Sequence, residues 1–272
     1  MVEAAGLSAA AAAFDAVAER FDERFDPWLS VAAQRQAVRV ELERAFPVGA
    51  RLIEIGGGAG GDALWLAQRG RQVLLTDASP AMVRMAKFKL SGVVGTRAEV
   101  CAAEDLEALV GRMDSPLDGA FSNFAALNCV SDLRPFARGL AQLLRPGAPA
   151  LLVVFGTLCP GEWMVEALRG RPKAMFRRLS RGEAPARLGG HEFSVRYHRR
   201  RDLQRALAPW FRTAGRRGIG VFTPPSAAEP WISHHPRLLG ALEMLDRSLS
   251  LPLAPLGDHV LYRFERTRAP AP

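Results

Sequence analysis

The chain has 272 residues, of which 49% are apolar, and its 36 basic against 28 acidic residues give a formal net charge of +8. Its three cysteines, Cys101, Cys129 and Cys159, show no C-x-x-C spacing, which argues against a disulfide framework or a zinc site, and we expect no metal. No apolar run reaches the ~18 residues that cross a bilayer and no signal peptide is recognisable, so we expect a cytoplasmic protein without membrane contact.

A helical lead comes first, over residues 8–46. Apolar residues recur at helical spacing from Phe14 to Phe25 and form one face of an amphipathic helix. Such a helix either packs on an edge of a sheet or covers a site as a lid. In the second case Phe21, Phe25 and Trp28 would line the site and exclude water from it.

An apolar strand begins at Leu52 and runs into a glycine-rich turn before a helix. The glycines of this turn are Gly56, Gly58, Gly60 and Gly61. Glycine can adopt a positive φ and lets a ligand touch the main chain, and the first N–H groups of the helix point at the same spot. The spacing also fits a dinucleotide fingerprint. However, the carboxylate of Glu54 suits a ligand with an ammonium group better than a pyrophosphate.

A second apolar strand, Val73 to Asp77, also ends in an acid. At the tip of a parallel neighbour of the first strand, Asp77 can accept hydrogen bonds from both hydroxyls of a ribose. Simpler roles stay open, because Asp77 could cap the helix that begins near Pro80 and Asp62 could cap the helix after the glycines. Met82 could be an ordinary core residue.

The run Glu54-x-Gly-x-Gly-x-Gly, followed by Asp77-Ala-Ser-Pro-Ala-Met82, resembles the class I S-adenosylmethionine-dependent methyltransferase family over roughly residues 12–157. The resemblance implies an α/β protein with a Rossmann-like, doubly wound, mostly parallel seven-stranded sheet and helices on both faces. It also implies S-adenosylmethionine as the cofactor, bound by a core at residues 50–157. We expect one domain over residues 1–272.

The resemblance places the cofactor on a defined set of residues. Many members have an Asp where this chain has Ala102, so the backbone of Ala103 and the carboxylate of Glu104 or Asp105 would hold the adenine instead. Ser122–Asn128 follows the fourth strand and would lie beside the methionine part of the cofactor. The expected cofactor residues are Glu54, Gly56, Gly58, Gly60, Asp62, Asp77, Ala78, Met82, Ala103, Glu104, Asn123 and Phe124, and Asn128 is assigned to the acceptor.

The family pattern ends near residue 157. We expect the last two strands at 213–222 and 257–265, and two insertions, 158–212 and 223–256, that cap the strand ends. Within them, residues 169–201 hold eleven Lys or Arg and two acids, a net charge of +9. Three explanations stay open: a site for an anionic small molecule, with Arg177 and Arg178 as ligands; a nucleic-acid surface; or a solvated face in an arginine-biased chain, which has 33 Arg and 3 Lys.

Methyl transfer to oxygen or nitrogen often needs a base for the acceptor proton. The five histidines are His191, His198, His234, His235 and His259. We favour His234 and His235 in the cap as the base and assign His259 to a structural role. We expect transfer to an O or N atom of a small metabolite of specialised metabolism, anionic if the basic stretch binds it, and we do not expect nucleic acid as a partner. An rRNA or tRNA methyltransferase and a protein that binds the cofactor without turnover are the alternatives.

Overall fold

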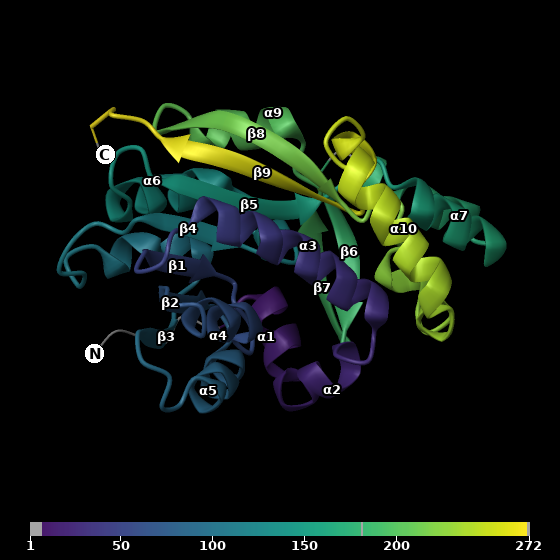
Figure 1. The fold of residues 1–272 in the computed structure, drawn as a ribbon, viewed down its shortest axis with the longest axis horizontal. Coiled ribbons are helices and arrows are strands. Elements are labelled where there is room, and N and C mark those ends of the chain that lie inside the picture. The colour runs from purple at the N-terminus through teal and green to yellow at the C-terminus, as the bar shows by residue number, and fades with distance from the viewer. Residues whose placement is uncertain (1–6, 181, 271–272) are drawn as a thin grey trace.

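The computed structural model describes residues 7–180 and 182–270, and it is built on one seven-stranded sheet (Figure 1). Its strand order is β3-β2-β1-β4-β5-β9-β8. The strands are β1 (Arg51–Ile55), β2 (Gln72–Asp77), β3 (Thr96–Val100), β4 (Gly119–Ser122), β5 (Pro149–Phe155), β8 (Phe211–Ile219) and β9 (His259–Arg266). The first five are parallel, and β9 lies antiparallel between β5 and β8. The expected Rossmann-like fold and its C-terminal antiparallel pair are confirmed.

Helices cover both faces of the sheet because the strand side chains alternate between two apolar cores. One core includes Leu52 and Leu75 and is covered by α3 (Leu29–Ala45), α4 (Gly61–Ala67) and α5 (Pro80–Lys89). The other includes Ile53 and Ile55 and is covered by η2 (Ala103–Leu109), α6 (Leu133–Leu143) and α9 (Arg200–Leu207). Glu54 therefore points to the same side of the sheet as α3.

The N-terminal segment is not the single helix that its periodicity predicts. It consists of α1 (Ala9–Asp15), η1 (Ala18–Arg20), α2 (Phe21–Phe25) and then α3. The break before α3 falls at Pro27, which lacks an N–H group and disfavours helix at the residue before it. Val38 and Leu42 of α3 are buried in the core under the sheet. Only α1, η1 and α2 thus form the lid, whereas α3 belongs to the main domain.

The lid is fastened to the helix that follows Asp77. One carboxylate oxygen of Asp15 accepts hydrogen bonds from the Ser79 hydroxyl (2.8 Å) and the Ala81 N–H (2.7 Å) at the start of α5. Lys89 near the end of α5 adds an ion pair to Asp22 at 2.5 Å. An anionic side chain at a helix N-terminus is favourable, so both ends of α5 hold the lid.

The C-terminal half adds a cap over the strand ends on the β5 side of the sheet (Figure 1). Its elements are α7 (Pro160–Leu168), α8 (Pro172–Met175), η4 (Arg177–Leu179), the β6 (Glu183–Leu188)–β7 (His191–Arg196) hairpin, η5 (Ser226–Ala228), η6 (Ile232–His234), α10 (Pro236–Leu249) and η7 (Ala254–Leu256). Leu203 and Leu207 of α9 are fully buried in the main core, so α9 covers the sheet and is not part of the cap. Among the described residues, no helix is both long and apolar enough to span a membrane.

Candidate functional site

The glycine turn after β1 brings main chain up against open space. Gly56, Gly58 and Gly60 all have positive φ, at 66°, 53° and 82°. A Cβ on Gly56 would lie 2.3 Å from the Ala126 Cβ, and one on Gly60 would lie 3.2 Å from the Ala86 Cβ, whereas one on Gly58 would meet nothing within 4 Å. Packing within the protein thus requires the outer two glycines, and Gly58 is the position where a ligand can touch the backbone.

Glu54 places a buried carboxyl beside this turn. Its side chain is 2% exposed, and its Oε2 has no hydrogen-bond partner among the described residues. Burial, and then the nearby Asp62 and Asp77, raise the pKa of Glu54 well above its usual value, which Arg35 and Arg39 only partly offset. Three carboxylates around one turn favour a positively charged occupant. The arrangement therefore fits a ligand with an ammonium group.

Asp77 lies at the end of β2, next to the turn. Its two carboxylate oxygens accept the N–H groups of Gly58 and Ser79, each at 2.9 Å. Burial raises the pKa of Asp77, and these two hydrogen bonds act in the opposite direction. The cap of α5 is Ser79, whose hydroxyl accepts the Met82 N–H. Because each carboxylate oxygen can accept a second hydrogen bond, the half-buried Asp77 can also bind ligand hydroxyls.

Asp62 connects three elements instead of capping α4, whose N-cap is Gly60. One oxygen accepts a hydrogen bond from Arg39 Nε and the other from Asn123 Nδ2, both at 2.7 Å. It therefore ties α3 and the glycine turn to the end of β4. The position predicted for the methionine part of the cofactor is thus physically joined to the turn.

The loop after β4 is held in a rare backbone conformation. Phe124 and Ala125 have φ values of 46° and 60°, a left-handed region that non-glycine residues seldom occupy and that is often found at functional sites. The Asn123 side chain accepts the Phe124 N–H at 2.7 Å. The Arg35 guanidinium lies 5.0 Å from the centre of the Phe124 ring. These contacts fix the Phe124 ring at the strand end.

Asn128 has a different position from the one expected. Its side chain is 1% exposed, accepts the Phe155 N–H at 3.0 Å and donates to the Arg196 carbonyl at 2.5 Å. Both ends of the amide are therefore used to join the β4 loop to β5 and β7. This geometry does not support the expected contact between Asn128 and an acceptor.

The lid covers the other side of the site. Met82 is buried in a small cluster with Ala59 of the glycine turn, and Phe21 packs against that cluster. Ring centres are 4.8 Å apart between Phe21 and Phe25, and 5.0 Å apart between Phe25 and Trp28. The three half-buried aromatic residues thus form a row that begins at the cofactor loops. Ala78 and Ala103 are half-buried at neighbouring strand ends, and Glu104 is exposed.

Arg177 and Arg178 are used inside the cap. Arg178 is 4% exposed and pairs with both Glu162 and Asp258, while Arg177 pairs with Glu162 at 2.6 Å. Buried carboxylates thus already neutralise these guanidinium groups. The structure does not support the expected role of Arg178 in binding an anionic acceptor.

The same cluster has the spacing of a metal site, since ligand atoms of Cys159, Glu162 and Asp258 lie within 4.8 Å of one another. However, Arg178 already supplies a positive charge to both carboxylates. Burial, reinforced by the charge of Asp258, raises the pKa of the Cys159 thiol to about 12, so the thiolate that a metal prefers is disfavoured. The donor set is therefore that of a structural ion cluster.

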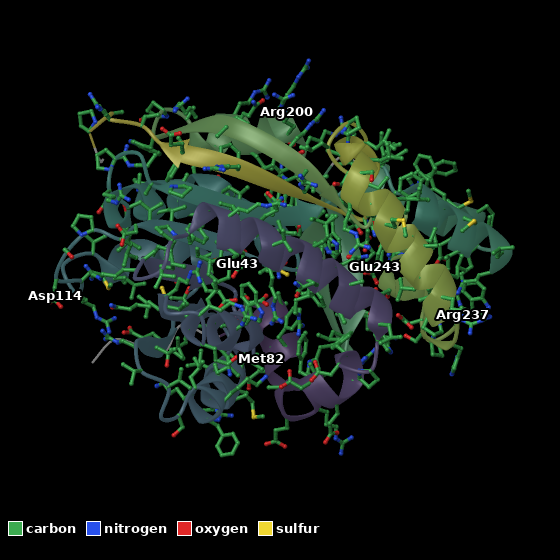
Figure 2. The ribbon with its side chains drawn as sticks, viewed as in Figure 1. Glu43, Met82, Asp114, Arg200, Arg237 and Glu243 are labelled. Carbon is green, nitrogen blue, oxygen red and sulfur yellow. The ribbon has the colours of Figure 1, made fainter. Side chains whose placement is uncertain are left out.

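His234 and His235 lie on the outside of the cap. Both side chains are exposed, and the His235 Nδ1 is 2.8 Å from the Trp231 carbonyl oxygen. Figure 2 shows Arg237, two residues further on, far from Met82 at the cofactor side of the molecule. A base must lie within hydrogen-bond reach of the acceptor proton, so this position does not support the proposed catalytic role of either histidine.

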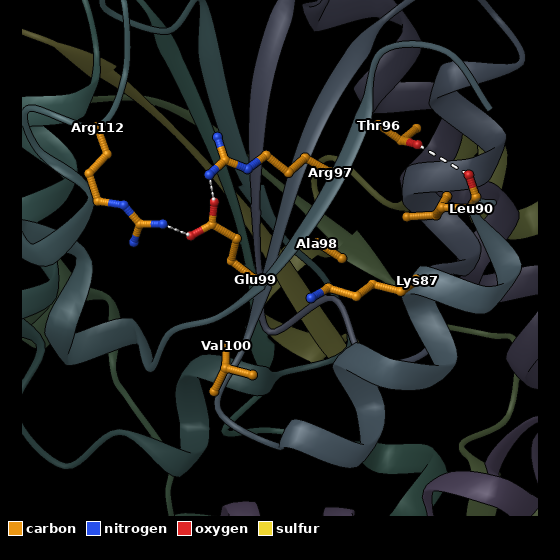
Figure 3. Close-up of a pocket in the computed structure, with 8 residues that line it drawn as sticks. All are labelled: Lys87, Leu90, Thr96, Arg97, Ala98, Glu99, Val100 and Arg112. Carbon is orange, nitrogen blue, oxygen red and sulfur yellow. Dashed lines mark hydrogen bonds and ion pairs between the residues drawn. The ribbon is translucent and has the colours of Figure 1, made fainter. Parts of the chain in front are cut away.

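Two pockets lie away from the glycine turn. One of about 590 Å³ opens on the outer side of the edge strand β3, where Arg97 and Arg112 both pair with Glu99 (Figure 3). The other, of about 470 Å³, lies between α1, the β6–β7 hairpin and the segment Asn128–Ser131. We call this second pocket the lid–hairpin groove. It adjoins the β4 loop, so it is the one that can serve the strand ends.

Sequence reasoning missed the contribution of α3. Gln34, Arg35 and Arg39 lie at helical spacing and face the site: Arg39 binds Asp62, Arg35 covers Phe124, and Gln34 reaches β9. Polar residues on one side of a helix are usually interpreted as a solvated face. The clue available in the sequence was that two arginines occur four residues apart on a helix otherwise expected to pack on a sheet.

Comparison with known proteins agrees with this geometry. Residues 52–147 match the model of a methyltransferase domain family. The chain is 30% identical over 149 residues to the tRNA 5-carboxymethoxyuridine methyltransferase of Escherichia coli, a match that covers 52% of this chain and 56% of that protein. It is 32% identical over 147 residues to the ubiquinone/menaquinone biosynthesis C-methyltransferase UbiE of Acidiphilium cryptum, covering 53% of this chain and 58% of that protein. The matches thus span little more than half the length of these relatives.

A similar fold occurs in the crystal structure of an S-adenosylmethionine-dependent methyltransferase from Listeria monocytogenes, with a TM-score of 0.57 and 14% sequence identity over 87% of this chain and 98% of that one. Because one relative is a tRNA methyltransferase, the comparisons do not support the expectation that nucleic acid is not a partner. The glycine turn, the acids at the ends of β1 and β2 and the matched domain coincide on the same residues. Residues 52–147 therefore form a methyltransferase domain with the class I S-adenosylmethionine-dependent fold, a fold whose methyl-donating cofactor is S-adenosylmethionine.

Proposed function

We propose that this protein transfers a methyl group from S-adenosylmethionine to an oxygen or nitrogen atom of a small acceptor. The observation that carries the proposal is the buried Glu54 carboxyl with an unpaired Oε2, surrounded by Asp62 and Asp77 beside a glycine turn that is open at Gly58. When bound, the cofactor supplies an activated methyl group on a positively charged sulfur. Residues of this chain bind the cofactor and the acceptor and exclude water from the site.

Each part of the cofactor has a chemical counterpart at the strand ends. Glu54 accepts hydrogen bonds from the ammonium group, Gly58 gives access to the main chain, and Asp77 accepts the ribose hydroxyls. Apolar contact to the adenine comes from Met82 and the lid above it. The remaining assignments are Gly56 and Gly60 in the turn, Asp62, Asn123 and Phe124 at the methionine part, and Ala78, Ala103 and Glu104 around the adenosine.

The acceptor site lies where β4 and β5 end, under the lid and the cap. The aromatic row of Phe21, Phe25 and Trp28 provides an apolar wall that excludes water, which favours transfer to a desolvated nucleophile. The lid–hairpin groove of about 470 Å³ is within the size range of small-ligand pockets. A small metabolite, including one of specialised metabolism, suits a space of this size.

Calorimetry tests the cofactor assignment. We expect binding of S-adenosylmethionine and S-adenosylhomocysteine, and we expect Asp77→Ala to weaken it by about 1.5–3 kcal/mol, because a partly buried hydrogen-bonding group is lost. Wild-type affinity in Asp77→Ala would refute the assignment. Release of S-adenosylhomocysteine is then measured with catechol, 4-hydroxybenzoate, 4-nitrophenol and tryptamine as probes. Tight binding without release on any probe favours the alternative of a cofactor-binding protein without turnover.

Transfer to RNA is the second candidate. It is favoured by the relative that acts on tRNA and by the net charge of +8. A gel-shift titration with total tRNA at two salt concentrations tests it. When a protein neutralises phosphates, the logarithm of its affinity falls linearly with the logarithm of the salt concentration, with a slope of about −0.7 per phosphate contact for single strands. No retention at low salt would remove this candidate, whereas salt-sensitive retention would call for methylation assays on tRNA.

A further inference from the structure

His259 lies at the same edge of the sheet as the glycine turn. It is the first residue of β9 and pairs with Phe155, the last residue of β5, and β5 in turn adjoins β4. Its ring is 6% exposed, stacks on the Phe155 ring with centres 5.0 Å apart, and meets the Phe124 ring edge-on at 6.0 Å. The imidazole is thus sandwiched between the ends of the two strands that border the acceptor space.

Gln34 on α3 fixes the protonation pattern of this ring. The Gln34 Nε2 donates to Asp258 Oδ2 (3.1 Å) and to the Pro224 carbonyl (3.3 Å), so the amide nitrogen faces two acceptors. The amide oxygen therefore faces His259 Nδ1, at 3.0 Å. An oxygen can only accept a hydrogen bond, so Nδ1 of the neutral ring carries the proton. Nε2 is then the nitrogen with the free lone pair.

The Nε2 edge of the ring has no partner within the described part of the chain. No hydrogen bond joins Nε2 to another described residue, and Nε2 is not among the unpaired polar atoms that are sealed from solvent. This basic nitrogen is therefore not sealed from solvent, and its ring lies between the ends of β4 and β5. A histidine with Nδ1 held by a fixed acceptor and Nε2 free has the arrangement of a general base.

We propose that His259 is the base that takes the acceptor proton, with Gln34 as the residue that positions it. The proposal rests on the proposed function and names a residue of that same site. In the step, the acceptor O or N atom forms a bond to the methyl carbon while the carbon–sulfur bond breaks and its electron pair stays on sulfur. The acceptor proton passes to Nε2, and the imidazolium then releases it to water.

The surrounding charges are compatible with a ring that gains and loses a proton. Although burial acts to raise the pKa of Asp258, the neighbouring His259 and Arg178 outweigh it and hold that pKa well below its usual range. An ionised carboxylate 3.4 Å from Nδ1 stabilises the imidazolium as it forms. The ionisable groups facing this region are Asp258 just before β9, Glu162 on α7, Arg178 on η4, Tyr197 after β7 and Arg35 on α3.

The test compares His259→Asn with a control at an exposed histidine, His235→Asn. The amide nitrogen of the introduced asparagine can replace Nδ1 as donor to Gln34, so the substitution removes the base and keeps the positioning contact. We expect kcat to fall by about 100-fold or more, the range for loss of a general base, with unchanged calorimetric affinity for S-adenosylhomocysteine. The loss should be smaller with 4-nitrophenol, whose phenol group is more acidic than those of the other probes and loses its proton more readily without a base. The control should behave as wild type.

The pH profile and the ring itself give independent readouts. Wild-type kcat should decline in acid, and the part of this decline that depends on the base should be absent in His259→Asn. Nitrogen NMR of the wild-type protein with S-adenosylhomocysteine should show a protonated Nδ1 and an unprotonated Nε2, a measurement that needs neither an acceptor nor a folded variant. A wild-type kcat in His259→Asn, or the opposite tautomer, would overturn the proposal. Absence of cofactor binding by the wild type would instead count against the proposed function.

Discussion

Replacing Glu54 with glutamine should change stability and binding in opposite directions. The carboxyl is 2% exposed, and burial together with Asp62 and Asp77 raises its pKa. A group with a raised pKa in the folded state favours folding while it is protonated, and that contribution is lost as the pH rises through the folded-state value. At a pH above the ordinary pKa of a carboxyl, Glu54 therefore destabilises the free wild-type protein, which must either bury the charge or hold the proton. Glu54→Gln keeps the shape of the side chain and removes this charge.

The expected magnitude for binding follows from one charge-assisted hydrogen bond. The Glu54 carboxyl has no hydrogen-bond partner at Oε2 among the described residues, and a hydrogen bond between this carboxyl and the ammonium group would contribute about 1.5–3 kcal/mol, the range for hydrogen bonds to charged groups. Glu54→Gln should thus weaken binding of S-adenosylhomocysteine by about 10- to 150-fold. Wild-type binding should itself weaken in acid, beginning at a higher pH than an ordinary carboxyl would give, because the ammonium group prefers the ionised form.

Thermal unfolding and calorimetry over a pH series check both expectations, the gain in stability and the loss of affinity. Without ligand, Glu54→Gln should melt at a higher temperature than wild type near neutral pH, and the difference should vanish in acid, where the wild-type carboxyl is protonated. With S-adenosylhomocysteine the order should reverse, because the wild type gains more from the ligand. A variant that is less stable without ligand and binds as tightly as wild type would refute the account of Glu54.

Two further substitutions test other parts of the structure. Gly58→Val should abolish cofactor binding in calorimetry, because the backbone has φ 53° and the new side chain would fill the open space beside the turn; retained affinity would show that the ligand does not approach there. Arg178→Gln should lower the free energy of unfolding by about 3–5 kcal/mol in a denaturant titration, because the buried carboxylate of Asp258 loses its guanidinium partner and Glu162 keeps only Arg177. A wild-type midpoint would show that these ion pairs do not stabilise the cap.

The fold and the cofactor side of the site could be predicted because their signals are local. A strand that ends in an acid and runs into glycines fixes its own geometry within about ten residues, so Glu54, Gly58 and Asp77 could be found without tertiary information. The apolar spacing from Phe14 to Phe25 predicts one helix, whereas the structure divides this stretch into α1, η1 and α2, so periodicity alone did not locate the breaks.

The acceptor side could not be predicted, because its contacts join distant segments. Arg178 meets Asp258 across 80 residues of sequence, and His259 meets Gln34 across 225. A charge count over residues 169–201 includes Arg178 as a free cation, although buried carboxylates neutralise it. Likewise, the turn-like sequence around His259 suggested a structural role, and only the pairing of β9 with β5 brings this ring to the strand ends.

The two acidic clusters at this edge of the sheet show how a binding site differs from a structural ion cluster. In the cap, Glu162 and Asp258 each have a guanidinium partner in Arg178, so no charge is left for a ligand. At the glycine turn, Arg39 pairs with Asp62, but the Oε2 of Glu54 keeps no partner among the described residues. An unpaired buried carboxyl is costly in the free protein. A bound cation would offset that cost, so the glycine turn fits a positively charged ligand better than the arginine-rich cap does.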